Sequence, residues 1–492
     1  MVQLTVCLDS GGEKPLYQQL YESLVSQIRS GALKAGDRLP GKRALAGQLA
    51  VAVNTVDAAY QMLAAEGYLE ARQRSGFFVL ESGGFPAVEA PALPHRPAAD
   101  APQEQEDEEE PCQRFDLSTG GVDTALFPFR TWGRIQRDLL YGEPELLRHG
   151  HRQGDENLRR ELAEYLRAYR GVDCGVEQIV VGAGVEYLLG LVARLLGPVT
   201  AAVENPGYDR SRMILENSGV RCRCVSIDEG GLSAEGLEAS GADLCYVTPS
   251  HHFPTAVTMP VSRRAQLLRW ARQRPGRYIL EDDYDAEFRF DTRPLPSLQG
   301  MGGRWGPVIY LCTFSKSLAP SIRIACMVLP MGLLGQYQAV FGSYANTVSR
   351  FEQQTLCRFL SQGHFTRHLS RMRSVYRGRM TALAEALEGA FGRENIVLQG
   401  RHTGLHLLLT LKNGPGEENM VRAARQAGVA LRGLSQYYME GRETCPENTV
   451  VLGYASLRDE EIPALAEALQ RAWLPSWGQE INGDFREEKK GL

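Results

Sequence analysis

The sequence has 492 residues, a net charge of −5 and ten cysteines, and a chain of this length folds into two or three domains rather than around one core. No apolar run is long enough to span a bilayer and the first residues do not form a signal peptide, so we expect a cytoplasmic protein with no membrane partner. The cysteines include no CxxC pair, which predicts reduced thiols and no metal site.

Charge is distributed unevenly along the chain. Residues 1–80 carry eight lysines and arginines against seven acids, a net charge of +1. Residues 81–112 carry nine acids and one arginine, a net charge of −8, which leaves +2 for the remainder. Residues 81–112 are rich in proline, alanine and acid and have almost no large apolar residue, so they cannot bury a core. We therefore expect an acidic linker at 81–112 between a domain at 1–80 and a domain at 113–480.

The first domain begins with a helical pattern. Apolar residues recur every four positions from Leu16 to Ile28, and Gly31 ends the pattern. Two further short helices are expected, one within residues 36–51 and one within residues 54–67, joined by a tight turn. This arrangement is a helix-turn-helix, in which the second helix enters the major groove of DNA. Residues 69–79 predict a β-hairpin wing with Arg72 and Arg74 at its tip.

The block resembles a GntR-type winged helix-turn-helix domain, through the segments LYQQL, GDRLP, NTV, LAAEGYL and SGFFV. The resemblance implies that double-stranded DNA is a partner. It also implies the DNA-contacting residues, which are Lys42 and Arg43 at phosphate or groove, Asn54 and Thr55 at the start of the recognition helix, and Ser75 and Gly76 at the tip of the wing, with Arg72 and Arg74 beside them.

The first domain departs from the family's pattern before both short helices. Gly41 stands where the family usually has a serine, and Ala52 and Val53 stand where it usually has a serine and an arginine. A hydroxyl cap and a contact to base or phosphate are therefore missing. With a net charge of +1, the domain is expected to bind non-specific DNA weakly. The alternative for this domain is a dimerisation module that no longer binds DNA. For the linker at 81–112, the alternative to a solvated spacer is a segment whose acids compete with DNA for the head.

Residues 178–192 predict a strand, a glycine turn and a helix. Backbone N–H groups at Gly184 and Val185, where that helix begins, suit a phosphate. Further along, the strand YILEDD ends in a carboxylate cluster, which puts Asp282 at the carboxyl edge of a parallel sheet, where ligands of α/β folds bind. A carboxylate there can keep a pyridine nitrogen protonated. Tyr284 can donate to the 3-oxygen of the same ring.

Residues 310–330 place one lysine between two short buried strands. Lys316 lies among small and apolar residues, and desolvation disfavours its ammonium form, so the amine becomes a nucleophile toward an aldehyde. Thr313, Ser315 and Arg323 can meet the phosphate of the same ligand. A Schiff-base lysine beside phosphate donors is the arrangement that the cofactor pyridoxal 5′-phosphate (PLP) requires. The alternative is a loop lysine that points to solvent.

The segments EDDYDAEF and TFSKSLAPSIR together resemble the fold type I aminotransferase domain of the MocR family, PLP-dependent regulators with a GntR-type head. The resemblance covers nearly the whole chain outside the linker and the last residues. It implies an α/β fold with large and small aminotransferase-like domains after the winged head, and a domain-swapped homodimer. It also places Tyr208 over the PLP ring and Arg210 toward a substrate carboxylate. For Arg210 a surface ion pair is the equal alternative.

Several positions of this second domain depart from the family. Phe253 stands where catalytic aminotransferases often have an asparagine that bonds the ring 3-oxygen, and His251 is either its substitute or a packed structural histidine. His149 stands where a tyrosine usually reaches the partner's phosphate. Glu186 lies close to the glycine turn, so we expect weaker phosphate binding than in the typical member. Residues 443–449 contain no arginine where the clamp for a substrate carboxylate usually lies.

The favoured hypothesis is a PLP-dependent, DNA-binding transcriptional regulator that senses PLP or a small amino compound. An effector can change its DNA binding only by binding two states with different affinity. The alternative is an active PLP-dependent aminotransferase with a vestigial head, in which Lys316 is also the proton-transfer base. A third possibility is a protein that merely senses or stores PLP. Operator binding distinguishes the first from the third, and pyridoxamine formation identifies the second.

Overall fold

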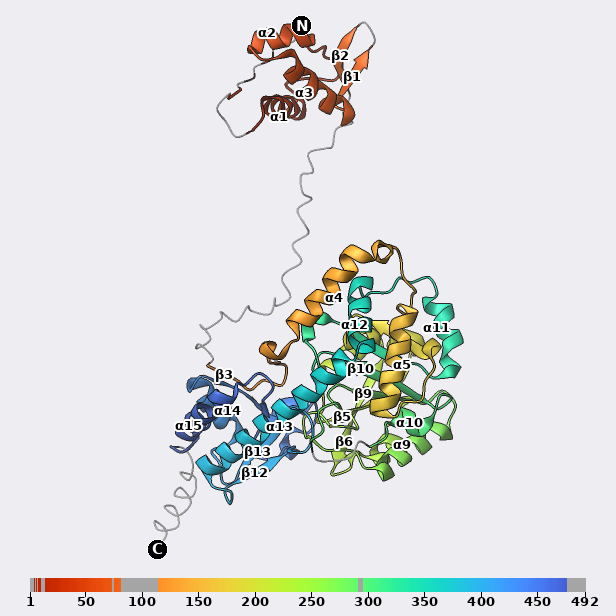
Figure 1. The fold of residues 1–492 in the computed structure, drawn as a ribbon, viewed down its shortest axis with the longest axis vertical. Coiled ribbons are helices and arrows are strands. Elements are labelled where there is room, and N and C mark those ends of the chain that lie inside the picture. Colours follow the sequence, from red (N-terminus) through yellow and green to blue (C-terminus); the bar gives the residue numbers. More distant parts are fainter. Residues whose placement is uncertain are drawn as a thin grey trace. The chain divides into compact units, whose positions relative to one another are not determined.

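The computed structural model describes residues 14–72, 75–80, 114–290 and 295–475, together with Leu4, Val6, Leu8 and Asp9. It divides into two compact units, Met1–Glu108 and Glu109–Leu492, which are drawn in Figure 1. The expected linker at 81–112, the wing residue Arg74 and the end of the chain after residue 475 lie outside the described residues.

The first unit is a winged helix-turn-helix. It consists of α1 (Leu16–Arg29), α2 (Lys42–Leu49), α3 (Val53–Ala65), β1 (Leu69–Arg72) and β2 (Gly76–Val79). The apolar face of α1 is buried as its spacing predicts, with Leu20 and Leu24 fully inside. The strands β1 and β2 pair antiparallel, with Leu69 opposite Val79 and Arg72 opposite Gly76. The predicted helices and hairpin are confirmed.

Packing rather than capping holds the two short helices. Their N-cap residues, Gly41 for α2 and Ala52 for α3, make no side-chain cap, as the departures from the family's pattern predict. A helix of eight residues is marginal without tertiary contacts. Here Leu45 and Tyr60 are fully buried in the core cluster that also contains Leu20 and Leu24 of α1, and the Tyr60 hydroxyl donates to the Pro40 carbonyl at 2.9 Å. The tertiary core therefore replaces the missing caps.

The second unit is built on an eight-stranded sheet in the order β4-β11-β10-β9-β8-β5-β6-β7. Its strands are β4 (Ile179–Gly182), β5 (Thr200–Asn205), β6 (Arg221–Asp228), β7 (Gly231–Leu232), β8 (Leu244–Val247), β9 (Tyr278–Asp283), β10 (Val308–Thr313) and β11 (Ala325–Val328). The five central strands β10, β9, β8, β5 and β6 run parallel. The predicted parallel sheet, with the acidic cluster at the carboxyl end of β9, is confirmed.

Helices cover both faces of this sheet because successive side chains of a strand point to opposite faces. Leu311 and Met327 pack on one face with α6 (Val185–Leu196) and α11 (Leu334–Phe341). Tyr310 and Cys312 pack on the other face with α5 (Glu156–Arg170) and α12 (Arg350–Ser361). The remaining helices of this part are α4 (Phe129–Gly142), α7 (Asp209–Asn217), α8 (Ala234–Ala239), α9 (Val261–Gln273) and α10 (Leu298–Gly302).

A smaller α/β part completes the second unit. Its antiparallel sheet has the order β12-β13-β16-β15, with β12 (Ile396–Gln399), β13 (His406–Leu411), β15 (Arg432–Gly433) and β16 (Thr449–Gly453). A separate parallel pair joins β3 (Phe115–Asp116) to β14 (Val429–Ala430). The long helix α13 (His364–Phe391) leads to this part, where α14 (Glu417–Gln426) and α15 (Ile462–Trp473) also lie (Figure 1).

A buried ion pair ties α5 to the central strand β9. The Arg170 guanidinium contacts the Asp283 carboxylate, and both side chains are almost fully buried. Arg170 also donates to the Ser250 hydroxyl at 2.7 Å, and the Tyr310 hydroxyl donates to Asp283 at 2.6 Å. The two buried charges therefore have several partners, without which their desolvation would be unfavourable.

We expect Arg170→Met to lower the free energy of unfolding of the second unit by about 3–5 kcal/mol, because it leaves the buried Asp283 carboxylate without its cation. Urea unfolding of the full chain measures the change. Arg160→Met on the same helix is the control, since Arg160 only joins an exposed pair with Glu156 and should cost less than about 1 kcal/mol. Equal losses in the two variants would contradict this role for Arg170.

Candidate functional site

The carboxyl ends of β9 and β10 and the start of α6 surround a cavity of about 280 Å³. β9 and β10 are parallel neighbours, so their carboxyl ends meet at one edge of the sheet. The structure brings nine of the predicted residues to the cavity wall: Val185, Tyr208, Arg210, Asp282, Tyr284, Thr313, Ser315, Lys316 and Arg323. Their roles there stay predictions.

The amine of Lys316 lies in the cavity wall, against backbone carbonyls. Its Nζ donates to the carbonyl of Thr119 at 2.5 Å and to that of Gly120 at 3.1 Å. Burial lowers the pKa of Lys316 from 10.5 to about 8, although the carboxylates of Asp285 and Asp116 oppose the shift. Lys316 is therefore desolvated and lies in the cavity wall, as the sequence predicts, and the alternative of a loop lysine that points to solvent does not apply.

The pleat of β9 sends Asp282 to the cavity and its neighbours elsewhere. Asp282 Oδ2 accepts from the Tyr246 hydroxyl at 2.5 Å. Its Oδ1 is buried and has no hydrogen-bond partner among the described residues. Burial, with Asp283 and Asp285 adding like charge, raises the pKa of Asp282 to about 6. The site thus holds a carboxylate oxygen that is ready to accept one hydrogen bond.

The other four acids of the cluster are used within the fold. Glu281 accepts the N–H groups of Leu298 and Gln299 at the start of α10, each at 2.9 Å. The remaining three pair with side chains: Asp283 with Arg170, Asp285 with His251, and Glu287 with the Tyr165 hydroxyl. Of the five acids, Asp282 is the one in the cavity wall, where a ligand can reach it.

Tyr284 is held from behind by a histidine and a carboxylate. The Tyr284 hydroxyl lies 3.1 Å from Nδ1 of His251, and Asp285 Oδ2 lies 2.8 Å from the same nitrogen. His251 packs so closely on Gly404 that a Cβ there would lie 1.8 Å from the imidazole. His251 is not part of the cavity wall. The structure therefore places the predicted cofactor residue His251 behind Tyr284, where it orients that hydroxyl.

Glycine and arginine meet at the end of the cavity next to α6. Gly184, the N-cap of α6, has a φ of +92°, and a Cβ there would lie 2.5 Å from Nη2 of Arg323. The hydroxyls of Thr313 and Ser315 lie 2.8 Å apart in the same wall. A helix N-terminus, two hydroxyls and an arginine form a suitable anion site. We refer to Gly184, Val185, Thr313, Ser315 and Arg323 as the anion end.

Glu186 contacts both arginines of the cavity. Arg323 Nη2 donates to Glu186 Oε2 at 2.6 Å, and Arg210 Nη1 lies 3.5 Å from Glu186 Oε1. Arg210 lines the cavity and also joins an exposed ion pair, so the expected surface pair is present, and its role toward a substrate carboxylate stays a prediction. The side chain of Tyr208 stands edge-on to Phe253 at 5.8 Å between ring centroids.

Sequence reasoning did not identify four residues of the cavity wall, which are Thr119, Gly120, Tyr246 and Thr248. Thr119 and Gly120 hold Lys316 through carbonyls, and a carbonyl leaves no signal in a sequence. Tyr246 and Thr248 come from the carboxyl end of β8, next to β9, so strand order rather than sequence brings them to the site. Their position in the apolar strand ending YVTP is the one signal that marks them.

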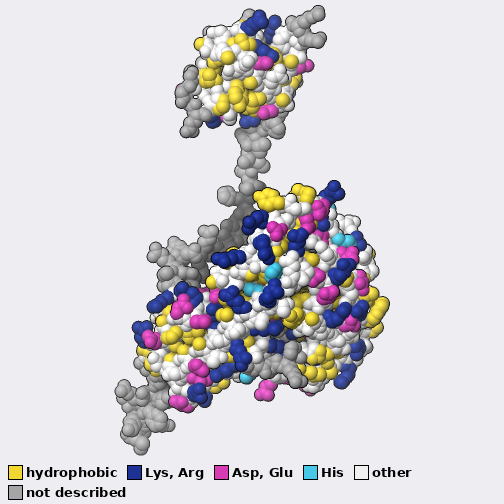
Figure 2. All heavy atoms as spheres, in the orientation of Figure 1, with side chains coloured by type: hydrophobic (Ala, Val, Ile, Leu, Met, Phe, Trp, Pro, Cys, Tyr) yellow, Lys and Arg dark blue, Asp and Glu magenta, His cyan; other side chains and the backbone are white. Residues whose placement is uncertain are grey.

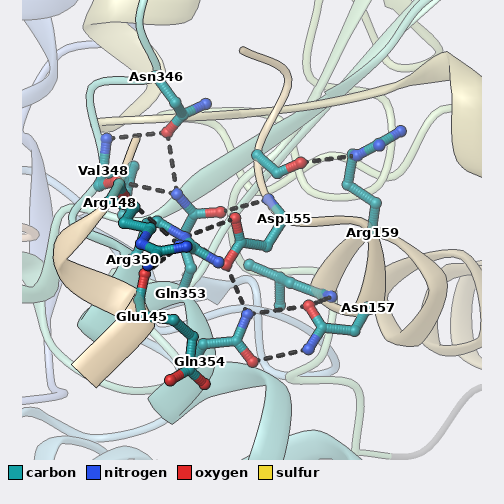
Figure 3. Close-up of polar contacts among 12 residues, drawn as sticks. Glu145, Arg148, Asp155, Asn157, Arg159, Asn346, Val348, Arg350, Gln353 and Gln354 are labelled. Carbon is teal, nitrogen blue, oxygen red and sulfur yellow. Dashed lines mark hydrogen bonds and ion pairs between the residues drawn. The ribbon is translucent and has the colours of Figure 1, made fainter. Parts of the chain in front are cut away.

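His149 lies outside this cavity, in the segment between Glu145 and Asp155. Both of those residues belong to the network of polar contacts that Figure 3 shows. Arg350 donates to the carbonyl of Glu145 at 2.8 Å and to the carboxylate of Asp155, the N-cap of α5. Gln354 donates to the same carboxylate at 2.7 Å. The network fixes both ends of the segment that carries His149, whose side chain is exposed.

The residues of the first unit that are predicted to contact DNA differ in their exposure and in whether they already form an ion pair. Lys42 pairs with Asp57 of α3, and its ammonium lies 5.0 Å from the centre of the Phe77 ring. Arg43 and Asn54 are exposed, whereas Thr55 is half-buried. Lys42 is therefore partly neutralised within the unit, and Arg43 presents its charge to solvent.

The wing keeps its arginine close to its own strands. Arg72 donates to Glu70 at 2.8 Å and packs 4.7 Å from the Phe78 ring. Ser75 is exposed at the turn, and Gly76 adopts a φ of +106°. On the face of the second unit that Figure 2 shows, Lys and Arg side chains are interspersed with Asp and Glu, so that face carries no field of a single sign.

Comparison with known proteins agrees with this architecture. The family model "Bacterial regulatory proteins, gntR family" matches residues 16–79. The crystal structure of LysN, an α-aminoadipate aminotransferase from Thermus thermophilus complexed with N-(5′-phosphopyridoxyl)-L-leucine, superposes with a TM-score of 0.63 at 27% identity, over 73% of this chain and 91% of that one. The protein is thus a GntR-type helix-turn-helix domain followed by a domain of aminotransferase fold.

Relatives share this combination over their full length. An uncharacterized HTH-type transcriptional regulator of Bacillus subtilis, YdeL, is 37% identical over 96% of this chain and 100% of its own. The probable rhizopine catabolism regulatory protein MocR of Rhizobium meliloti is 33% identical over 95% of each chain. The chain belongs to the MocR family of HTH-type transcriptional regulators. Among the helices of the described ranges, none combines the length and apolar character needed to cross a bilayer.

The lowered pKa of Lys316 predicts a distinctive labelling profile. Reductive methylation with formaldehyde reaches only the neutral amine, so labelling of Lys316 should rise with pH through about 8, whereas an ordinary lysine rises only near about 10.4. Mass spectrometry of the peptide that contains residue 316 follows the reaction, and exposed lysines labelled in the same sample serve as the reference. A Lys316 profile that coincides with the reference would show that its ammonium is not desolvated.

Proposed function

We propose that this transcriptional regulator holds PLP on Lys316 and binds double-stranded DNA through its winged head, in response to PLP or a small amino compound. One observation carries the proposal: a buried lysine amine, a carboxylate oxygen without a hydrogen-bond partner and an arginine line the same cavity. These three groups have the chemistry that an aldehyde, a pyridine nitrogen and a phosphate require.

The residues of the cavity fit the cofactor one by one. Asp282 Oδ1, buried and unbonded among the described residues, suits a protonated ring nitrogen. Tyr284, oriented by His251, would donate to the ring 3-oxygen, and Tyr208 would cover one face of the ring. The anion end supplies phosphate donors, and the absence of a side chain at Gly184 leaves room for the Arg323 guanidinium. PLP would contribute an aldehyde and an electron-accepting ring.

Lys316 has the protonation behaviour that this role needs. Its pKa of about 8 keeps a useful fraction of the amine neutral near pH 7, whereas an exposed lysine is almost wholly ammonium. The carbonyls of Thr119 and Gly120 orient the amine within the cavity. An amino compound that enters the cavity would compete with Lys316 for the aldehyde, and this competition is the basis on which the domain would detect it.

DNA binding is proposed for the predicted contact residues of the head. Arg43, Asn54 and Thr55 would meet the duplex at the ends of α2 and α3, and Arg72, Arg74, Ser75 and Gly76 would form the wing contact. Lys42 would contribute less, since it already pairs with Asp57. The head has a net charge of only +1, so we expect specific contacts rather than general charge to dominate its affinity.

We further propose that the protein is a cytoplasmic, domain-swapped homodimer. Exposed apolar side chains on α4 and the turn after it support a second copy as the partner, namely Leu140, Tyr141 and Leu147. Large exposed apolar residues that lie together mark interaction surfaces. In a dimer the two heads act on one operator, and a change in the cavity that alters the dimer would alter their spacing.

The alternative, an active aminotransferase, has one observation in its favour. The lowered pKa of Lys316 also suits a base that moves a proton at a substrate α-carbon. Against it, both arginines of the cavity contact Glu186, and neither Arg432 nor Arg442 is part of the cavity wall. Among the described residues, a substrate carboxylate therefore has no unengaged arginine at the cavity wall, and sensing remains the favoured function.

The visible absorbance of purified protein tests the proposal. Wild-type protein with PLP should show a band that shifts but persists when amino acids are added. Lys316→Ala should lose the lysine-linked band, because Lys316 is the one lysine among the described residues of the cavity wall. Borohydride reduction and mass spectrometry should locate the cofactor on Lys316. Bleaching with release of pyridoxamine, reversed by a keto acid, would establish the aminotransferase instead, and no band at all would refute PLP binding.

DNA binding by the head is tested with alanine variants of the neighbouring residues Lys42 and Arg43. Arg43→Ala should weaken operator binding by about tenfold and reduce the salt slope by about 1, because it removes an exposed phosphate contact. Lys42→Ala should cost clearly less, since its charge is shared with Asp57. Fluorescence anisotropy at several salt concentrations measures both. If Lys42→Ala costs as much as Arg43→Ala, the Asp57 pair does not hold in the complex.

A further inference from the structure

We propose that Glu186 is an internal anion that holds the anion end of the cavity, and that a phosphorylated ligand binds only by displacing its carboxylate from Arg323. The inference rests on the proposed function, since it concerns how the same cavity takes PLP. It assigns Glu186 a specificity-determining role, in which the residue sets how much the phosphate group adds to the affinity of a ligand.

The contacts place Glu186 where a phosphate would compete with it. Glu186 belongs to the first turn of α6, next to the backbone N–H groups of the anion end. Its Oε2 accepts from Arg323 Nη2 at 2.6 Å, a distance typical of a charge-assisted hydrogen bond. The same Arg323 nitrogen donates to the Ala183 carbonyl at 3.3 Å. Within the described cavity wall, the cation nearest to Gly184 is therefore already paired with a carboxylate.

Arg210 provides a second partner for Glu186. Arg210 Nη1 lies 3.5 Å from Oε1, whereas Arg323 donates to Oε2, the other oxygen of the same carboxylate. When a phosphate takes Arg323, Glu186 can keep its contact with Arg210 and needs to leave only one arginine. The side chains of Glu186, Arg210 and Arg323 are each roughly half exposed or more, so the rearrangement moves no buried group.

Charge explains why the exchange lowers the affinity for a phosphate. The two arginines carry two positive charges and Glu186 cancels one of them, whereas a ligand phosphate carries about two negative charges near pH 7. The phosphate must therefore break an existing pair and then lie near a carboxylate of like charge. For partly exposed groups these effects sum to roughly a tenfold loss in affinity. The loss applies only to the phosphorylated ligand.

A weakened anion end suits a protein that responds to ligand concentration. A cofactor held mainly through its phosphate would stay bound at all concentrations, whereas one that must displace Glu186 binds and leaves within a sensing range. Arg323 also stays neutralised when the cavity has no ligand. The cavity should therefore distinguish PLP from the unphosphorylated aldehyde pyridoxal less sharply than the anion end alone would predict.

The test compares two aldehydes on two charge-matched variants of the full chain. Dissociation constants for PLP and for pyridoxal are measured from visible absorbance on wild type, Glu186→Gln and Glu216→Gln. Glu216 is the control, because it pairs with Arg212 on α7 and is not part of the cavity wall. Glu186→Gln should bind PLP about tenfold more tightly, with pyridoxal unchanged within about twofold. Glu216→Gln should match wild type for both.

A second measurement separates this inference from the proposed function. Calorimetric titration with inorganic phosphate needs no bond to Lys316, and Glu186→Gln should again bind it more tightly than wild type does. Unchanged PLP and phosphate affinities in Glu186→Gln, or an equal gain for PLP and pyridoxal, would overturn the role of Glu186. If phosphate affinity rises but neither aldehyde attaches to Lys316, the role of Glu186 stands and the PLP proposal fails.

Discussion

The second unit depends on the burial of five carboxylates in the seven residues that end β9 and follow it. Each buried acid carries a desolvation penalty that only a specific partner can offset. The partners come from distant parts of the chain: Arg170 on α5, the N-terminus of α10 and His251 in the loop after β8. Pairing these acids fixes the surrounding elements, and Asp282 is the acid of the five that lines the cavity, with one oxygen left without a partner among the described residues.

At the anion end, the charge that has a partner within the chain is a cation rather than a carboxylate. Arg323 lies on the backbone of Gly184, at a position where no side chain fits, and its charge, although half exposed, attracts a counterion. Glu186 supplies that counterion from within the chain. The cavity therefore has all the groups that a phosphorylated pyridine aldehyde needs, together with a competitor for one of them. This combination is better suited to graded sensing than to permanent attachment.

In the head, tertiary contacts stabilise helices that lack caps in the sequence, and they also pair a lysine that the motif predicts to contact DNA. The missing serine caps of α2 and α3 are confirmed, yet the helices form because Leu45 and Tyr60 are buried. Conversely, Lys42 matches the family's basic pair, but Asp57 one helix away neutralises it. Neither contact is visible from the spacing of residues along the chain, since each joins residues that only the fold brings together.

The sequence by itself determined the order of the elements, the helix-turn-helix with its wing, the parallel sheet, and the motifs around Asp282 and Lys316. Local periodicity and short motifs carry that information. Only the tertiary structure decided which partners hold the other four acids of the cluster, that His251 lies behind Tyr284, and that Glu186 joins Arg323 to Arg210. The pleat of a strand separates neighbouring side chains, but the packing of α6 and the order of β8, β9 and β10 determine which face becomes the site.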